Sequence, residues 1–132
     1  MPDTDNGKPR RVLVVEDDPS SRKALMLLLK RQGHEVDGAD CARQALDKLV
    51  NKPEIVVLDL MLPDGLGIAV LRQIRMQGLP AQVAILTGVH EPQSISEITE
   101  YEPDAIFTKP LNLESLIEWM RTGVVPWETR PL

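Results

Sequence analysis

Five polar residues follow apolar, β-branched runs that lie far apart in the chain. Glu16 and Asp17 directly follow the first run, and Asp59 ends the third. Thr87 ends the fourth run, and Lys109 comes directly after the fifth. If the runs are strands of one parallel sheet, their carboxyl ends meet at the same edge. The sequence therefore predicts that three carboxylates, a hydroxyl and an ammonium lie close together.

A cluster of this kind is suited to Mg²⁺ and to a phosphoryl group. Carboxylates at close range repel one another, and a hard divalent cation with oxygen ligands relieves that repulsion. A lysine and a threonine beside the cation can contact phosphoryl oxygens. The remaining carboxylate can then attack phosphorus and form an aspartyl phosphate. Asp59 is the best candidate for this nucleophile because its run is expected to lie between the first and the fourth.

Each of these residues also has a purely structural interpretation when it is taken alone. The acidic run 16–18 before Pro19 is typical of a helix N-terminus, and we expect Asp18 to be only a helix cap. Asp59 could end a strand as a turn former, and Thr87–Gly88 taken alone is more often a turn than a ligand. The joint placement of these residues at strand ends is what favours a chemical site.

The apolar runs alternate with helical patterns along the chain. Strands are predicted at 11–15, 35–37, 54–59, 82–87 and 104–108. Helices are predicted within 19–33, 42–49, 68–78, 95–98 and 113–120. The second strand and the fourth helix have the weakest patterns, and the second strand is predicted mainly because the alternation requires it.

Strands that alternate with helices in this way predict an α/β fold. We expect a flavodoxin-like (βα)5 arrangement, with a doubly wound parallel five-stranded sheet in the strand order 2-1-3-4-5. Ligands of such sheets bind at the carboxyl ends of the strands, near the point where the strand order reverses. The polar residues described above are expected at these ends.

The composition is that of an ordinary globular domain. The chain has 132 residues, of which 42% are hydrophobic and 27% are charged, and its formal net charge is −5. The negative charge argues against direct binding of nucleic acid. A single cysteine, Cys41, argues against a disulfide framework and a multi-thiolate metal site. We predict a disordered arm at 1–10, a folded domain at 11–120 and a tail or linker at 121–132.

The sequence has no recognisable targeting segment. The N-terminal residues are polar, and no apolar run approaches the roughly 18–20 residues that a membrane-spanning helix needs. We therefore expect a cytoplasmic protein that makes no membrane contact.

Four segments together resemble the receiver domains of two-component response regulators. They are Val14–Asp17, Leu58–Gly65, Ile85–Gly88 and Lys109–Pro110. None of the segments is specific alone, but all four occur in order, at the right spacings and at predicted strand ends. The resemblance covers residues 11–120.

The resemblance implies a role for each acidic residue. Asp59 matches the phosphoacceptor, and Asp17 matches the principal direct ligand of Mg²⁺ (or Mn²⁺). Glu16 matches an acidic position that often contacts the ion through water. The backbone carbonyl of Met61, two residues after the phosphoacceptor, matches the remaining protein ligand of the ion.

The resemblance also assigns the hydroxyl and the amine. Thr87 matches the switch hydroxyl that follows the phosphoryl group, and Gly88 is the small residue that leaves room for the phosphodonor. Lys109 matches the lysine that pairs with the phosphoryl group. The peptide bond before Pro110 is expected to be cis.

The sequence departs from the family pattern near the last strand. Ile106 stands where family members usually carry Tyr or Phe, as the second switch position beside Thr87. Phe107 has the opposite strand parity and should point to the other face of the sheet. Leu111 replaces the usual Phe after the Lys-Pro pair. These departures leave the phosphorylation chemistry intact but leave the output mechanism open.

The function implied by the resemblance is that of a phosphoacceptor in a two-component phosphorelay. A histidine kinase or a His-phosphotransfer protein would transfer a phosphoryl group to Asp59, with Mg²⁺, and so switch protein–protein contacts. The domain would be a signalling module rather than an enzyme, although it would catalyse its own phosphorylation and, as an open option, its autodephosphorylation. Its downstream partner would be a separate protein or an output domain beyond Leu132, and formation of a homodimer stays open.

Two other functions remain as alternatives. The first is a Mg²⁺-dependent phosphatase of the haloacid-dehalogenase type, which also uses an aspartyl nucleophile. Such enzymes place a second Asp two residues after the nucleophile, where this chain has Met61, and we expect no cap domain here. The second is a receiver fold used only for protein interaction, which the complete acidic site argues against.

Overall fold

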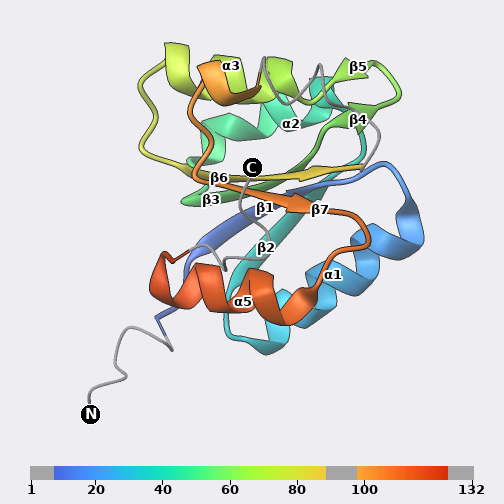
Figure 1. The fold of residues 1–132 in the computed structure, drawn as a ribbon, viewed down its shortest axis with the longest axis vertical. Helices are drawn as coiled ribbons and strands as arrows, with labels where there is room; N and C mark the ends of the chain where they lie inside the picture. The colour runs from blue at the N-terminus through green and yellow to red at the C-terminus, as the bar shows by residue number, and fades with distance from the viewer. Residues whose placement is uncertain (1–7, 89–97, 125–132) are drawn as a thin grey trace.

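Strands and helices alternate along the chain, as the apolar patterns predict (Figure 1). The computed structural model describes residues 8–88 and 98–124. The strands are β1 (Arg11–Val15), β2 (Glu35–Ala39), β3 (Ile55–Asp59), β4 (Met61–Leu62), β5 (Gly65–Leu66), β6 (Gln82–Thr87) and β7 (Ala105–Thr108). The helices are α1 (Pro19–Arg31), α2 (Ala42–Lys48), the 3-10 turn η2 (Leu49–Asn51), α3 (Ile68–Met76) and α5 (Leu113–Thr122).

Five parallel strands form the sheet, in the order β2-β1-β3-β6-β7. Because β4 and β5 form a separate antiparallel hairpin, this is the predicted order 2-1-3-4-5 of the main strands. Helices α1 and α5 cover one face of the sheet, and α2 and α3 cover the other (Figure 1). The strand order reverses between β1 and β3, so the loops that follow these two strands lead to helices on opposite faces. This is the predicted doubly wound α/β fold.

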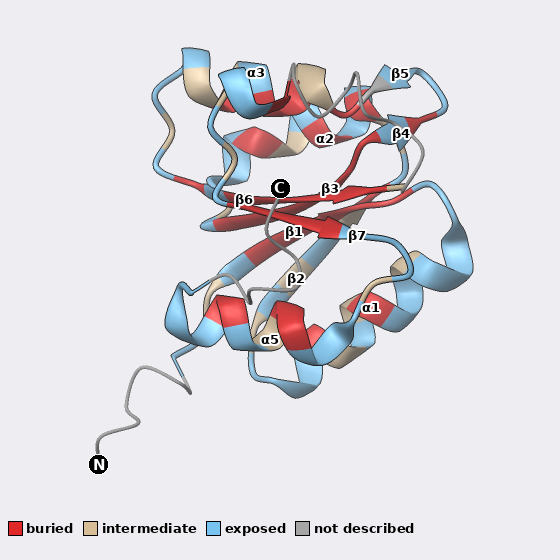
Figure 2. Ribbon diagram, viewed as in Figure 1, coloured by how far each residue is buried: buried red, intermediate tan, exposed pale blue. Residues whose placement is uncertain are grey.

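The central strands β1, β3 and β6 are buried on both faces, whereas the edge strand β2 is largely exposed or half-buried (Figure 2). Strand β3 is buried at every position. Val56 and Leu58 belong to the core under α2 and α3, whereas Ile55 and Val57 belong to the core under α1 and α5. Burying a side chain of this size stabilises a fold by about 1.5–3 kcal/mol. The central strands are therefore a rigid base that fixes the residues at their carboxyl ends.

The start of α1 fixes the loop that follows β1. Asp18 is the N-cap, and its Oδ2 accepts a hydrogen bond from the backbone nitrogen of Ser21 at 2.8 Å. Pro19 lies in the first helical turn, where its missing N–H costs nothing. The prediction that Asp18 caps this helix is confirmed, and the cap holds the acidic residues before it close to the helix start.

The segment after β3 is more ordered than the predicted chain break at Pro63–Gly65. It forms the hairpin of β4 and β5, whose two-residue strands are too short to leave a periodic signal in the sequence. The carboxylate of Asp64, in the turn, accepts hydrogen bonds from the backbone nitrogens of Ala42 at 2.8 Å and Arg43 at 2.9 Å. The hairpin therefore caps α2 and is tied to it.

Other boundaries differ by a few residues. Strand β2 continues to Ala39, two residues beyond its predicted end. Of the predicted fourth helix, residues 98–100 are helical, and Ile95 lies outside the described residues. Most of the predicted arm and tail, residues 1–7 and 125–132, also lie outside them. Within the described ranges, no helix is long and apolar enough to cross a membrane.

Candidate functional site

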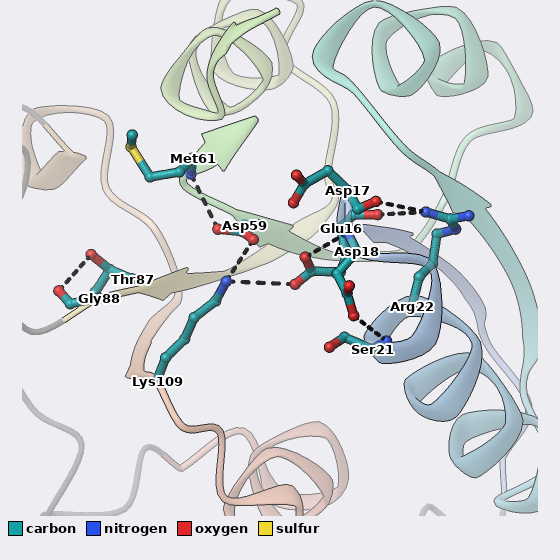
Figure 3. Close-up of polar contacts among 10 residues, drawn as sticks. All are labelled: Glu16, Asp17, Asp18, Ser21, Arg22, Asp59, Met61, Thr87, Gly88 and Lys109. Carbon is teal, nitrogen blue, oxygen red and sulfur yellow. Dashed lines mark hydrogen bonds and ion pairs between the residues drawn. The ribbon is translucent and has the colours of Figure 1, made fainter. Parts of the chain in front are cut away.

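The polar residues that the sequence singled out lie along one edge of the sheet, at the carboxyl ends of β1, β3, β6 and β7 (Figure 3). Glu16, Asp59 and Thr87 are buried, with exposed fractions of 6%, 2% and 1%. Asp17 and Lys109 are exposed. The arrangement is thus a set of buried acceptors with one acidic residue and one amine at the solvent side.

The carboxylates form a group that suits a hard divalent cation. One carboxylate oxygen from each of Glu16, Asp17 and Asp59 lies within 4.8 Å of the other two. An all-oxygen set with an exposed side fits Mg²⁺, which keeps several waters, and the same donors suit Mn²⁺. The backbone nitrogen of Met61 donates to Oδ1 of Asp59 at 3.1 Å, which holds the carboxylate and the first residue of β4 together.

Lys109 is the cation of this group. Its Nζ lies 2.7 Å from Oδ2 of Asp59 and 3.6 Å from Oε2 of Glu16. Partial burial lowers the pKa of Lys109, but the hydrogen bond and charge of Asp59, with a contribution from Glu16, raise the pKa above its usual value. The Lys109 ammonium thus contacts two of the three clustered carboxylates, so among the described residues the cluster keeps an excess of negative charge.

The pKa of Glu16 reflects this excess of negative charge and the burial of its carboxylate. Burial raises the pKa of Glu16 above its usual value, and the nearby charge of Asp59 raises it further. The hydrogen bond that Oε1 accepts from the backbone nitrogen of Asp18, at 3.1 Å, and the charge of Lys109 lower the pKa of Glu16 but do not cancel the rise. A bound cation would favour the ionised form of all three carboxylates.

The backbone at Asp59 is held in place by contacts on both sides. Directly after β3, the backbone nitrogen of Leu60 donates a hydrogen bond to the carbonyl of Leu86, at 2.9 Å. Gly67 packs directly against the other side of this backbone, because a Cβ at Gly67 would lie 2.2 Å from the carbonyl oxygen of Asp59. Any larger residue at position 67 would displace the backbone of Asp59.

Thr87 and Gly88 lie at the end of β6, beside the acidic group. Oγ1 of Thr87 donates to the carbonyl of Gly88 at 3.3 Å. Within the part of the chain that the structure describes, an added Cβ at Gly88 would meet nothing within 4 Å, so these residues leave room at this position. The backbone nitrogen of Lys109 donates to the carbonyl of Thr87 at 2.8 Å, and the peptide bond from Lys109 to Pro110 is cis.

Ile106 and Phe107 point to opposite faces of the sheet, as their parity predicts. Ile106 is 7% exposed and packs in the core under α2 and α3. Phe107 packs edge-on against Trp119 of α5, with ring centroids 6.2 Å apart and an interplanar angle of 69°. The aromatic residue of this strand therefore belongs to the α5 side and not to the side where the family pattern places one.

Three residues of this region were not predicted from the sequence. Gly67 supports the backbone of Asp59, and Asp64 ties the hairpin to α2, as described above. Arg22, one helical turn after the N-cap of α1, donates to the backbone carbonyls of Glu16 and Asp17. The weak signals were the glycine at a helix start, an acidic residue in a Pro-Asp-Gly turn and an arginine one helical turn after a cap.

Comparison with protein families identifies a match over most of the chain. A model of the response regulator receiver domain matches residues 12–121. The virulence transcriptional regulatory protein PhoP of Salmonella typhimurium is 36% identical over 113 residues, which cover 84% of this chain and 50% of PhoP. The transcriptional regulatory protein PhoP of Escherichia coli is 34% identical over the same length. The chain thus spans about half the length of the curated relatives it matches.

Solved structures show the same fold. The chemotaxis response regulator CheY4 of Vibrio cholerae aligns with a TM-score of 0.79 at 25% identity, over 89% of this chain and all of CheY4 (100%). A two-component response regulator from Clostridium difficile aligns with a TM-score of 0.79 at 27% identity, over 86% of this chain and 94% of that chain. These relatives share the fold of this chain over most of its length.

Proposed function

This chain belongs to the response regulator receiver domain family, and from that premise we propose that it accepts a phosphoryl group on Asp59 in a two-component phosphorelay. The observation that carries the proposal is the environment of Asp59. Its carboxylate is buried, is held by the backbone of Met61, and contacts the ammonium of Lys109. A fixed carboxylate beside a cation suits in-line attack on phosphorus.

The proposed donor is the phosphohistidine of a histidine kinase or a His-phosphotransfer protein. An oxygen of Asp59 forms the new bond to phosphorus while the bond from phosphorus to the imidazole nitrogen breaks. The electron pair of that bond stays on the imidazole, which takes a proton from water. Lys109 places a positive charge where the phosphoryl oxygens arrive, and the Thr87 hydroxyl offers a donor beside them.

The proposed cofactor is Mg²⁺ or Mn²⁺. Glu16, Asp17 and Asp59 would hold the ion with carboxylate oxygens, and Met61 would add its backbone carbonyl. When bound, the ion neutralises negative charge on the transferring phosphoryl group and on the carboxylates around it. The contribution of the protein is to hold the carboxylates close together. The loop after β1 and the hairpin after β3 fix their positions.

The proposed role is signalling rather than turnover of a substrate. The relatives are described as transcriptional regulatory proteins, and we propose that phosphorylation here controls a partner protein or an attached output domain in the cytoplasm. In such a role the domain promotes its own phosphorylation and has no separate substrate. Dimer formation is one route by which the phosphorylated state could be read out.

The test is phosphorylation by acetyl phosphate with Mg²⁺, followed by intact-mass measurement. Wild type is expected to gain a single phosphoryl adduct, and Asp59→Asn to gain none. Asp47→Asn, which alters an exposed carboxylate on α2, is the matched control and should gain the adduct. An adduct that persists in Asp59→Asn would place the site elsewhere. A folded wild type that takes no adduct from any donor would favour a receiver fold used only for protein contact.

A further inference from the structure

Arg22 reaches back from α1 to the loop that carries two of the three clustered carboxylates. Its Nη1 donates to the carbonyl oxygen of Glu16 at 2.9 Å and lies 3.5 Å from the carbonyl oxygen of Asp17 (Figure 3). Arg22 thus contacts the backbone of both residues, on the side away from their carboxylates. Within the described ranges, the hydrogen bonds of its guanidinium go to backbone carbonyls and not to the three carboxylates.

The path of the Arg22 side chain depends on a missing side chain in β2. A Cβ at Gly38 would lie 3.3 Å from Cδ of Arg22 and 2.7 Å from Sδ of Met26. The arginine and the methionine therefore pack on bare backbone of the neighbouring strand. This packing fixes the aliphatic part of Arg22, so that less conformational freedom is lost when the guanidinium binds the loop.

The loop has to hold a repulsive arrangement before any cation binds. Glu16 and Asp17 converge on Asp59, and Lys109 offsets only part of the negative charge. Repulsion between carboxylates favours a loop that turns outward. A hydrogen bond from the backbone nitrogen of Glu16 to the carbonyl of Ala39, at 3.0 Å, fixes the start of the loop, and Arg22 fixes the next two carbonyls.

We propose that Arg22 is a positioning residue for the cation site: it holds the backbone of Glu16 and Asp17 so that both carboxylates face Asp59 before the divalent ion binds. The inference rests on the proposed function, because it concerns the same site. Groups that orient the ligands of a metal typically change metal affinity by tenfold or more when they are removed. The effect of Arg22 acts through geometry and not through contact with the ion.

The first measurement is the affinity for Mg²⁺ alone, by calorimetric titration. Arg22→Met keeps an unbranched chain over Gly38 but removes the guanidinium, and its Mg²⁺ dissociation constant is expected to rise about tenfold. Lys23→Met makes the same change of net charge at the next, exposed residue and should stay within about twofold of wild type. Equal affinities of Arg22→Met and Lys23→Met would overturn the proposal.

A lysine at the same position separates geometry from charge. Arg22→Lys keeps the charge and the packing, but its Nζ lies one bond nearer the backbone than Nη1, which makes both contacts, so its Mg²⁺ affinity should lie between wild type and Arg22→Met. An Arg22→Lys protein that binds Mg²⁺ as tightly as wild type would assign the effect to charge alone and would also overturn the proposal. This variant keeps the packing, so it decides the question even if Arg22→Met does not fold.

A measurement without metal tests positioning directly. In the presence of a chelator, backbone amide hydrogen exchange at Asp17 and Asp18 should be about tenfold faster in Arg22→Met than in Lys23→Met, with no change in β3. Faster exchange throughout the sheet would show a merely structural role and contradict the proposal. A wild type that binds Mg²⁺ but accepts no phosphoryl group would contradict the proposed function alone, and the role of Arg22 would stand.

Discussion

Charged residues gather at both edges of the sheet. In one group the charges are balanced by their partners, and in the other they are not. At the amino edge, Arg75 of α3 donates to the carbonyls of Tyr101, Ala81 and Glu102 and to the carboxylate of Asp104. At the carboxyl edge, the ammonium of Lys109 contacts two carboxylates of a group of three. The first group joins α3 to two loops, and its cation, Arg75, is surrounded by hydrogen-bond acceptors. The second keeps excess negative charge, which is the property that binding of a divalent cation requires.

The same contrast separates stability from function. Asp104 also accepts a hydrogen bond from the backbone nitrogen of Val83, at 2.7 Å, so the amino-edge cluster closes the start of β6 as well. Removal of a group there leaves fixed acceptors without their donor. Removal of a carboxylate at the other edge relieves repulsion. Removal of a donor at the amino edge and removal of a carboxylate at the carboxyl edge should therefore have effects of opposite sign on stability.

The largest expected effect is at the amino edge. Arg75→Met should lower the free energy of unfolding by about 2–3 kcal/mol, because several carbonyls and one carboxylate lose their donor together. Urea denaturation at pH 7 measures this, and Arg72→Met on the exposed face of the same helix is the control. If the two variants are equally stable, the amino-edge group is not the structural clamp described here.

Lys109 should show the reverse balance of effects. Lys109→Met is expected to slow phosphorylation of Asp59 by about tenfold or more, because a positive charge beside the phosphoryl oxygens is lost. The cost in stability should be about 1 kcal/mol or less, since the Lys109 side chain is 41% exposed. Intact-mass time courses and urea denaturation test the two parts. A loss of several kcal/mol would make Lys109 a structural residue like Arg75.

A smaller effect of opposite sign is expected for Glu16. Its pKa is raised in the folded protein, so the folded state binds a proton more tightly than the unfolded chain, and stability falls as pH rises through the folded pKa. A protein without this carboxylate does not lose stability in this way as the pH rises. In a chelator, Glu16→Gln should thus be more stable than wild type at pH 7, and the difference should vanish below about pH 4. A Glu16→Gln protein less stable than wild type at neutral pH would contradict the penalty that burial and the charge of Asp59 impose on the ionised Glu16.

The smallest expected change is at Ile106. Its side chain is already buried in the core, is β-branched and short, and has no hydroxyl to exchange partners. We expect phosphorylation to move Thr87, while Ile106 keeps one rotamer; the predicted movement of the loop 87–91 falls largely on residues outside the described ranges. Crystal structures with and without beryllofluoride test this. An Ile106 that passes between exposed and buried positions would show that it performs the switching role of the usual aromatic residue.

The sequence predicts the frame and the acidic group better than the contacts that hold them. Strands β1 and β6 have the predicted ends because continuous apolar runs mark a strand that is buried on both faces. The residues at those ends follow from the topology. Arg22 and Arg75 were not predicted, because they bind backbone carbonyls, which every residue offers and no pattern marks. The distance in sequence from Arg75 to Glu102 also hides their contact.

The most direct test of the charge imbalance at the carboxyl edge is the effect of Mg²⁺ on the free energy of unfolding of wild type and Asp17→Asn. An ion that binds only the folded state stabilises it by about 2.7 kcal/mol at a concentration one hundred times its dissociation constant. We predict that saturating Mg²⁺ stabilises wild type on this scale and leaves Asp17→Asn nearly unchanged, with Glu16→Gln between the two. Equal stabilisation of wild type and Asp17→Asn would contradict the assignment of a cation site to this edge of the sheet.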